Sequence, residues 1–276
     1  MIGVFDSGLG GLSILKAIRK QLPQYDYLYF GDNARAPYGT RSPELVYRYT
    51  WQCVHYLFEK GCHLVILACN TASAKALRDI QQNELLQYDP KRRVLGVIRP
   101  TIEQLPQISH TGHIGILATE GTVRSNAFPI EIHKLAPELK ITQQACPMWV
   151  PLVENNEHNS KGADFFVKKY LQEILVSDPD IDTLVLGCTH YPFLYDKIKN
   201  EIQNRQKNIT VIKQGEMVAL SLQDYLHRHP EIETTCTKNA TCTYFTTETA
   251  KSFNEKAKTF MNEQIYAENV EFWHDL

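Results

Sequence analysis

Short runs of residues that are apolar at every position recur along the chain and alternate with longer amphipathic segments. These runs lie at 2–5, 27–30, 64–68, 94–98, 114–118 and 184–186. Strands that are apolar on both faces are typical of parallel sheets covered by helices. Because such strands alternate here with helical segments, the sequence predicts an α/β architecture of mostly parallel sheets flanked by helices.

Two of the intervening segments have the sequence pattern of amphipathic helices. Segment 42–61 opens with Ser42, whose hydroxyl can cap a helix, and continues with Pro43, which is favoured at the first helical position. It ends at Gly61, and glycine closes helices readily because it tolerates the left-handed conformation. A second helix is predicted over 163–176, where apolar residues recur near helical spacing.

Two pairs of strand ends resemble each other at similar offsets along the chain. One pair aligns Gly3 with Gly115, and the other aligns Cys69 with Cys188, at offsets of 112 and 119 residues. Chance explains one such pair easily, but it explains two pairs at nearly one offset less well. Repetition over this distance predicts two pseudo-symmetric α/β units.

Charge and hydropathy patterning exclude several kinds of partner. The chain has 29 Lys plus Arg and 31 Asp plus Glu, a net charge of −2, and no dense basic block. A nucleic-acid-binding face is therefore not expected. The longest apolar run, 64–69, is far shorter than the roughly 20 residues that cross a bilayer. The first residues also lack the pattern of a secretory signal, so we expect no membrane partner.

Seven cysteines, an odd number, include no Cys-x-x-Cys pair. This usage is typical of reduced thiols and predicts a cytoplasmic protein. Two of the cysteines open polar turns after buried strands, in the segments Cys-Asn-Thr (69–71) and Cys-Thr-His (188–190). Ligands bind at such strand ends in open α/β sheets, and a following helix N-terminus favours the thiolate. We interpret these two thiols as functional and the other five as small buried residues.

Several chemistries use cysteine, and two equivalent thiols fit one of them best. Disulfide exchange commonly uses a Cys-x-x-Cys loop, and the spacings match no familiar zinc pattern, so no metal is expected. A hydrolase built on Cys188 and His190 leaves Cys69 without a role. Two acid/base groups across a cleft instead suit inversion of a carbon stereocentre. With an ordinary thiol pKa of about 8.5, modest tuning makes one thiol a base and the other an acid near neutral pH.

Four segments resemble the motifs of glutamate racemases, in the expected order and across nearly the whole chain. They are GVFDSGLGGL (3–12), GDNARAPYG (31–39), ACNTAS (68–73) and GCTHYP (187–192). The glycine run lacks the last glycine of a dinucleotide-binding fingerprint and the lysine of a P-loop. The resemblance implies an enzyme that needs no cofactor, interconverts L- and D-glutamate by a two-base mechanism, and supplies D-glutamate for peptidoglycan synthesis.

The resemblance also implies an arrangement of domains. A discontinuous first domain, 1–98 plus 211–276, would carry Cys69, and a second domain over 99–210 would carry Cys188. The active site would lie in the cleft between them. Relatives commonly form homodimers, so a homodimer is expected as well.

Individual roles follow from the same resemblance. Cys69 would deprotonate the D-enantiomer and Cys188 the L-enantiomer, with His190 assisting at Cys188. Asp6 would pair with the substrate ammonium or orient a thiol, and Glu154 would be either an auxiliary acid or a surface carboxylate. The substrate would be held by residues of four turns: Asp6, Ser7, Tyr38, Gly39, Asn70, Thr71, Thr189 and His190.

Three other functions stay open at this point. Aspartate racemisation differs by one substrate methylene, which provides only roughly 1–3 kcal/mol of discrimination. A two-domain binding module for an amino acid would keep the cleft without the chemistry, and a hydrolase would form an acyl adduct on Cys188. A turn carrying Thr119 and Thr122 also matches the resemblance, but it is not counted among the predicted site residues.

Overall fold

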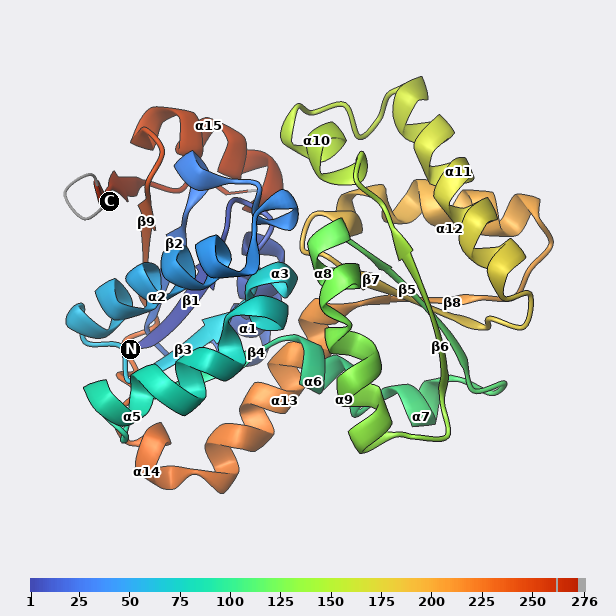
Figure 1. Cartoon of the computed structure of the whole chain (residues 1–276). Helices are drawn as coiled ribbons and strands as arrows, with labels where there is room; N and C mark the ends of the chain where they lie inside the picture. The colour runs from blue at the N-terminus through green and yellow to red at the C-terminus, as the bar shows by residue number, and fades with distance from the viewer. Residues whose placement is uncertain (262, 273–276) are drawn as a thin grey trace.

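The computed structural model describes residues 1–261 and 263–272, which form two β-sheets with helices packed on their faces (Figure 1). The first sheet has six strands in the spatial order β10 (Ala267–Asn269), β9 (Cys242–Thr246), β2 (Tyr27–Gly31), β1 (Ile2–Asp6), β3 (Leu64–Leu67) and β4 (Arg93–Gly96). The second sheet has the order β6 (Lys140–Ala145), β5 (His113–Ala118), β7 (Thr183–Gly187) and β8 (Thr210–Lys213). All neighbouring strands are parallel, so the predicted architecture is confirmed.

The central strands are the ones that the sequence predicts, because helices bury both of their faces. β1, β2, β3, β5 and β7 are buried almost throughout and cover the predicted runs. The run 94–98 is a strand only as far as Gly96, because Ile98 already begins α6 (Ile98–Ile102). Four strands, β6, β8, β9 and β10, are not among the predicted runs. β6 is an edge strand with mostly half-buried, polar side chains.

Helices fill the connections between strands. Between β1 and β4 lie α1 (Leu12–Gln21), the 3₁₀ turns η1 (Asn33–Arg35) and η2 (Tyr38–Thr40), α2 (Pro43–Glu59), α3 (Asn70–Lys75), α4 (Leu77–Asp79), the π-helical turn η3 (Ile80–Glu84) and α5 (Leu85–Tyr88). Between α6 and β8 lie α7 (Leu105–Ile108), α8 (Glu120–Ser125), α9 (Ala127–Leu135), α10 (Trp149–Glu154), α11 (Lys161–Ser177), η4 (Tyr191–Leu194) and α12 (Tyr195–Asn204). After β8 come α13 (Gln214–Arg228), α14 (Pro230–Glu233) and α15 (Ala250–Met261). Among the described residues, no helix is both long and apolar enough to cross a bilayer.

Both helices predicted from the sequence are present. In α2 the Ser42 hydroxyl accepts a hydrogen bond from the Leu45 N–H at 3.3 Å, and Gly61 follows the helix with a φ of +87°. α11 begins two residues before the predicted start, because Ser160 caps it by accepting from the Ala163 N–H at 3.2 Å. In each case a side chain supplies an acceptor that the first helical turn otherwise lacks.

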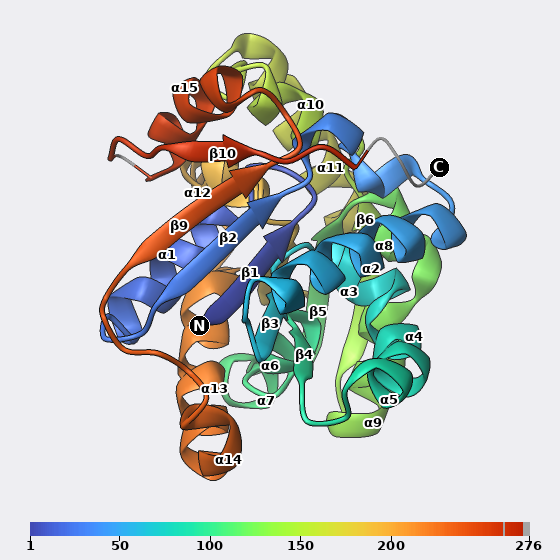
Figure 2. The same ribbon diagram turned by 90° about the vertical axis from the view of Figure 1, so that its left-hand side faces the viewer.

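The chain passes between the two sheets through α6 and returns through α13. α13 packs against α1, and a Cβ placed on Gly215 would lie 2.9 Å from the Cβ of Ala17, so the close approach depends on glycine. Beyond α13, β9 and β10 extend the first sheet next to β2 (Figure 2). The C-terminal part of the chain thereby completes the sheet that the N-terminal part began.

The two-domain division, 1–98 plus 211–276 and 99–210, stays a prediction. β8 begins at Thr210 and pairs with β7, so the predicted boundary between 210 and 211 falls inside a strand of the second sheet. Asn262 and residues 273–276, which the division assigns to the first domain, lie outside the described residues.

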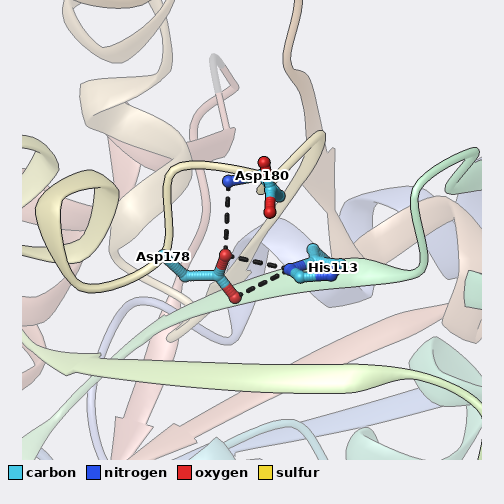
Figure 3. A group of neighbouring side chains, drawn as sticks. All are labelled: His113, Asp178 and Asp180. Atoms are coloured by element: carbon cyan, nitrogen blue, oxygen red, sulfur yellow. Dashed lines mark hydrogen bonds and ion pairs between the residues drawn. The ribbon is translucent and has the colours of Figure 1, made fainter.

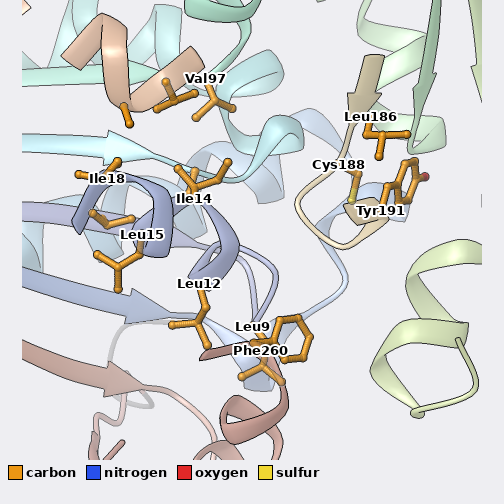
Figure 4. Packing of buried hydrophobic residues seen from close by; sticks show 14 of the residues in the cluster. Leu9, Leu12, Ile14, Leu15, Ile18, Val97, Leu186, Cys188, Tyr191 and Phe260 are labelled. Atoms are coloured by element: carbon orange, nitrogen blue, oxygen red, sulfur yellow. The ribbon is translucent and has the colours of Figure 1, made fainter. Parts of the chain in front are cut away.

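One cluster of buried side chains joins the two halves. It runs from β1 through α1 to β7, and it includes Leu12 and Ile14 on one side and Leu186 and Tyr191 on the other (Figure 4). Cys188 packs at the edge of this cluster, beside Tyr191. Because the cluster is continuous, the position of the second sheet relative to the first depends on apolar packing as well as on chain connections.

A buried carboxylate anchors the start of β5 to the end of α11. Asp178 accepts hydrogen bonds from His113 Nδ1 at 2.9 Å and from the Asp180 N–H at 3.2 Å (Figure 3). It also accepts one from the Thr142 hydroxyl at 3.2 Å. Lys140 Nζ lies 3.5 Å from Asp178 Oδ2. Burial alone would raise the pKa of Asp178, but these donors lower it below the usual range.

We expect Asp178→Asn to reduce the free energy of unfolding at pH 7 by about 1–3 kcal/mol, because it removes charge-assisted hydrogen bonds. The carboxylate pKa is lower in the folded state, so its contribution is complete above the unfolded value of about 3.9. The contribution is lost as the pH falls through the folded value. Urea unfolding of both proteins from pH 7 to pH 3 should show the difference shrinking below about pH 4.

Asp180→Asn is the matched control, since this neighbouring side chain is exposed and only its backbone N–H contacts Asp178. It should change stability by less than about 0.5 kcal/mol. A difference between Asp178→Asn and the parent protein that does not vary with pH would contradict the role assigned to the ionised carboxylate.

Candidate active site

A cavity of about 370 Å³ lies where the strands of both sheets end. Its wall includes Ser7 after β1, Cys69 after β3, Thr119 after β5 and Cys188 after β7. Carboxyl ends of parallel strands are the usual place for ligands in such sheets. The two cysteines that the sequence analysis singled out therefore line one cavity, although they belong to different sheets.

Cys69 is the N-cap residue of α3. Its Sγ lies 3.3 Å from the Ser7 hydroxyl and accepts a hydrogen bond from the Ala72 N–H at 3.5 Å. Burial, together with the nearby Asp6 carboxylate, raises the pKa of Cys69 to about 12, although the two hydrogen bonds oppose this shift in part. Near pH 7 this thiol is protonated, and the pKa shift is larger than the modest tuning that the sequence predicts.

Cys188 has different neighbours. His190 Nδ1 lies 3.9 Å from its Sγ, and His190 Nε2 lies 2.5 Å from Glu154 Oε1 at the end of α10. Burial alone would lower the pKa of His190, but its hydrogen bonds to Cys188 and Glu154 raise it well above the usual value. The hydrogen bond from His190 in turn lowers the pKa of Glu154 against the effect of burial. An imidazolium thus lies beside Cys188 at neutral pH, balanced by a carboxylate.

Asp6 is buried behind the cavity wall. Its carboxylate accepts hydrogen bonds from the Gly8 N–H at 3.0 Å and from the Thr189 hydroxyl at 3.4 Å, so it links the two halves. Burial raises the pKa of Asp6, although the charge of His190 and two backbone N–H groups oppose the shift. Within the described chain, Asp6 is not part of the cavity wall, and its contact with a substrate stays a prediction.

The glycine run after β1 lets two turns pack against each other. A Cβ on Gly10 would lie 2.3 Å from Thr189 Oγ1 and 2.5 Å from His190 Nδ1, and one on Gly11 would lie 2.4 Å from the Asp6 Cβ. Any larger residue would push the turn after β1 away from the turn after β7. This run therefore serves close packing across the site.

The loop that carries Tyr38 and Gly39 covers one side of the cavity. The Tyr38 hydroxyl donates to the buried Asp32 carboxylate, which also accepts from Arg35 Nε at 2.7 Å. Burial and Asp32 both raise the pKa of Tyr38 well above its usual value. Since its hydroxyl is taken by Asp32, Tyr38 offers a ligand its ring and backbone. A Cβ on Gly39 would lie 3.0 Å from the Thr119 Cβ, so glycine also permits close packing here.

Hydroxyl groups from both halves meet in the cavity. Thr71 Oγ1 lies 3.0 Å from Thr119 Oγ1, which is 3.1 Å from Thr122 Oγ1. Thr119 was left out of the predicted site residues, although the repeat offset of 112 residues makes it the counterpart of Ser7. Asn33 and Cys146 also line the cavity and were not predicted. Asn33 lies inside the 31–39 motif, whereas Cys146 has no neighbouring motif that would have revealed it.

The cavity wall carries hydroxyl, amide, thiol and carboxyl groups. Of the described residues that form it, none is lysine or arginine. The one group of three possible metal-ligating side chains in the described chain is His113, Asp178 and Asp180, whose ligand atoms lie within 4.8 Å of one another outside this wall. Anionic groups of a ligand would therefore be bound by hydroxyls and backbone N–H groups.

Comparisons with known proteins find relatives along most of the chain. A family model described as Asp/Glu/Hydantoin racemase matches residues 2–220. A glutamate racemase of Ruegeria sp. (strain TM1040) is 38% identical over 96% of this chain and 97% of its own length. A glutamate racemase of Geobacter metallireducens is 44% identical over 70% of this chain and 68% of its own length.

Solved structures resemble the whole fold. A glutamate racemase isoform from Bacillus anthracis superposes with a TM-score of 0.86 at 34% identity, covering 99% of this chain and 97% of that one. The glutamate racemase from Francisella tularensis in complex with D-glutamate gives a TM-score of 0.85 at 30% identity, covering 98% of this chain and 97% of that one.

We expect Glu154→Gln to lower the pKa of His190, because the substitution removes the carboxylate that stabilises the imidazolium. The decrease should be about one unit or more, since a hydrogen bond to a charged group contributes roughly 1.5–3 kcal/mol and one pKa unit corresponds to about 1.4 kcal/mol. NMR titration of the His190 ring, assigned with a His190→Ala variant, measures the change.

Glu157→Gln removes an exposed carboxylate just beyond α10 and should leave the His190 titration unchanged. If Glu154→Gln also leaves it unchanged, Glu154 is not the group that keeps His190 protonated.

Proposed function

Because this chain belongs to the Asp/Glu/hydantoin racemase family, we propose that it interconverts L- and D-glutamate with two thiols as acid and base. The observation that carries the proposal is that Cys69 and Cys188, one from each sheet, line the same cavity. The curated relatives that match nearly the whole chain are glutamate racemases, which favours glutamate over aspartate as the substrate. Production of D-glutamate for peptidoglycan is the role that the resemblance implies.

In the L-to-D direction, Cys188 acts as the base. Its thiolate takes the α-proton, so an S–H bond forms as the Cα–H bond breaks, and the electron pair is delocalised into the α-carboxylate. The Cys69 S–H then delivers its proton to the opposite face, which leaves Cys69 as the thiolate. The D-to-L direction runs the same steps in reverse.

The unequal surroundings of the two thiols support this assignment of starting states. His190 Nδ1 lies 3.9 Å from Cys188 Sγ, so a charged imidazole faces the sulfur that takes the α-proton in this direction. The high pKa of Cys69 keeps its proton available for donation. Turnover from D-glutamate needs a substrate charge that lowers the pKa of Cys69.

The substrate carboxylates would be bound without lysine or arginine. The hydroxyls of Ser7, Thr71, Thr119 and Thr189 line the cavity and can donate hydrogen bonds to carboxylate oxygens. Backbone N–H groups at the start of α3 add donors. As negative charge develops at the α-carbon and its carboxylate, these fixed dipoles stabilise it without reorganisation of solvent.

The proposal extends to location and assembly. A cytoplasmic location is supported by seven cysteines without a Cys-x-x-Cys pair and by the free thiols of the described chain. A homodimer rests on the family resemblance alone.

We expect Cys69→Ser and Cys188→Ser each to lower the rate of racemisation by about 10²–10⁴-fold, because each removes one of the two acid/base groups. In deuterium oxide, Cys69→Ser should exchange the α-hydrogen of L-glutamate without forming D-glutamate, since Cys188 can still act on one face. Cys188→Ser should do the same with D-glutamate. Circular dichroism follows racemisation, and mass spectrometry follows exchange.

Cys62→Ala is the control, because this buried thiol lies outside the cavity wall and should not affect either reaction. Glutamate binding without α-hydrogen exchange by the parent protein would favour a binding module over a racemase. An acyl adduct on Cys188, with Cys69 dispensable, would favour a hydrolase. Faster turnover of L-aspartate than of L-glutamate would show that the protein is an aspartate racemase.

A further inference from the structure

A chain of buried hydrogen bonds connects the cavity wall to the two segments that join the sheets. Asn70, the first residue of α3, donates from Nδ2 to Gln214 Oε1 at 2.6 Å. Gln214 is the first residue of α13 and is 2% exposed. It lies 144 residues from Asn70 in sequence and belongs to none of the motifs that the sequence analysis found.

The surroundings of Gln214 determine which way its amide faces. Its Nε2 donates to the Val97 carbonyl at 3.3 Å and to the Thr101 hydroxyl at 2.9 Å. The Val97 carbonyl can only accept hydrogen bonds. The Thr101 hydroxyl already donates its hydrogen to the Val97 carbonyl at 2.9 Å, so toward Gln214 it can only accept. Both partners therefore need the NH₂ group of Gln214, and this leaves Gln214 Oε1 facing Asn70.

The same reasoning determines the orientation of Asn70. Since Gln214 Oε1 only accepts, Asn70 must present its NH₂ group to it, and Asn70 Oδ1 is left on the other side of the amide. Asn70 lines the cavity next to Cys69, and its Oδ1 is buried without a hydrogen-bond partner in the described chain. A buried acceptor without a donor is costly, so this oxygen is suited to a ligand that brings an N–H group.

We propose that Gln214 is a positioning residue, which orients the Asn70 amide so that its carbonyl oxygen receives the α-ammonium group of the substrate. This inference rests on the proposed function and deepens it, because it explains how the cavity distinguishes the ammonium from the carboxylates. If Asn70 were flipped, its NH₂ group would repel the ammonium and would compete with Ser7 and Thr71 for a carboxylate. Gln214 acts only through Asn70 and does not itself line the cavity.

Gln214→Met tests the proposal, because methionine has similar size but no hydrogen-bonding amide. We expect the KM for both enantiomers to rise about tenfold, the effect of weakening one hydrogen bond to a charged group. The ammonium is held equally in the ground state and the transition state, so kcat should change by less than about twofold. Thr101→Val should raise KM in the same direction, and Thr101→Ser, which keeps the hydroxyl, should restore it.

A double-mutant cycle separates positioning from a purely structural role. In an Asn70→Ala background, Gln214→Met should have no further effect on KM or on the Kd of D-glutamate measured by calorimetry. Gln104→Met is the matched control: this glutamine also contacts α13, through the Met217 carbonyl, but has no contact with Asn70. It should leave KM and Kd unchanged.

The proposal is overturned if Gln214→Met leaves KM unchanged, if it lowers kcat alone, or if its effect persists without the Asn70 amide. A parent protein that binds D-glutamate but does not racemise it would refute the proposed function. In that case a Kd raised by Gln214→Met would still support the positioning role. A parent protein that neither binds nor converts glutamate would refute both.

Discussion

The contact between the turn after β1 and the turn after β7 is the constraint on which the rest of the site depends. Gly10 lies so close to Thr189 and His190 that no side chain fits between them. This contact brings the ends of two separate sheets together, so that a thiol from each lines one cavity. Across the same boundary, the Asp6 carboxylate accepts a hydrogen bond from the Thr189 hydroxyl. A site for two-sided chemistry is thus a consequence of how two similar units pack.

The two units supply similar frameworks but unequal chemistry. Each places a cysteine at the end of a buried strand, yet Cys69 has a hydroxyl beside it and a carboxylate nearby, whereas Cys188 has an imidazole paired with a carboxylate. The first environment raises the pKa of its thiol, and the second places a charged imidazole beside the sulfur. In any single turnover, an enzyme with two opposed acid/base groups uses one as the proton acceptor and the other as the proton donor. The two thiols occupy equivalent places in a repeated framework, and their different neighbours support these two different roles.

Much of the architecture could be predicted from the sequence, because buried strands and capped helices are local signals. The central strands β1, β2, β3, β5 and β7, the capped helix α2 and the two cysteine-bearing turns fall into this class. Edge strand β6 could not be predicted, because its half-exposed polar residues lack the pattern of a buried strand. Thr119 could have been found from the repeat offset. Gln214 could not, because its importance comes from contacts with Asn70 and Val97, more than a hundred positions away.

The perturbed groups around Cys69 suggest how binding and proton transfer are coupled. Among the described residues Asn70 Oδ1 has no donor, and burial and the nearby Asp6 raise the pKa of the Cys69 thiol. A substrate ammonium held at Asn70 would satisfy the acceptor and would place a positive charge near the thiol. A nearby positive charge favours the thiolate, so the ammonium of the bound substrate, rather than its hydrogen bond to Asn70, would lower the pKa of the base that acts on it. Cys69 would then become reactive only when a substrate is present, which protects a buried nucleophile from side reactions in the free protein.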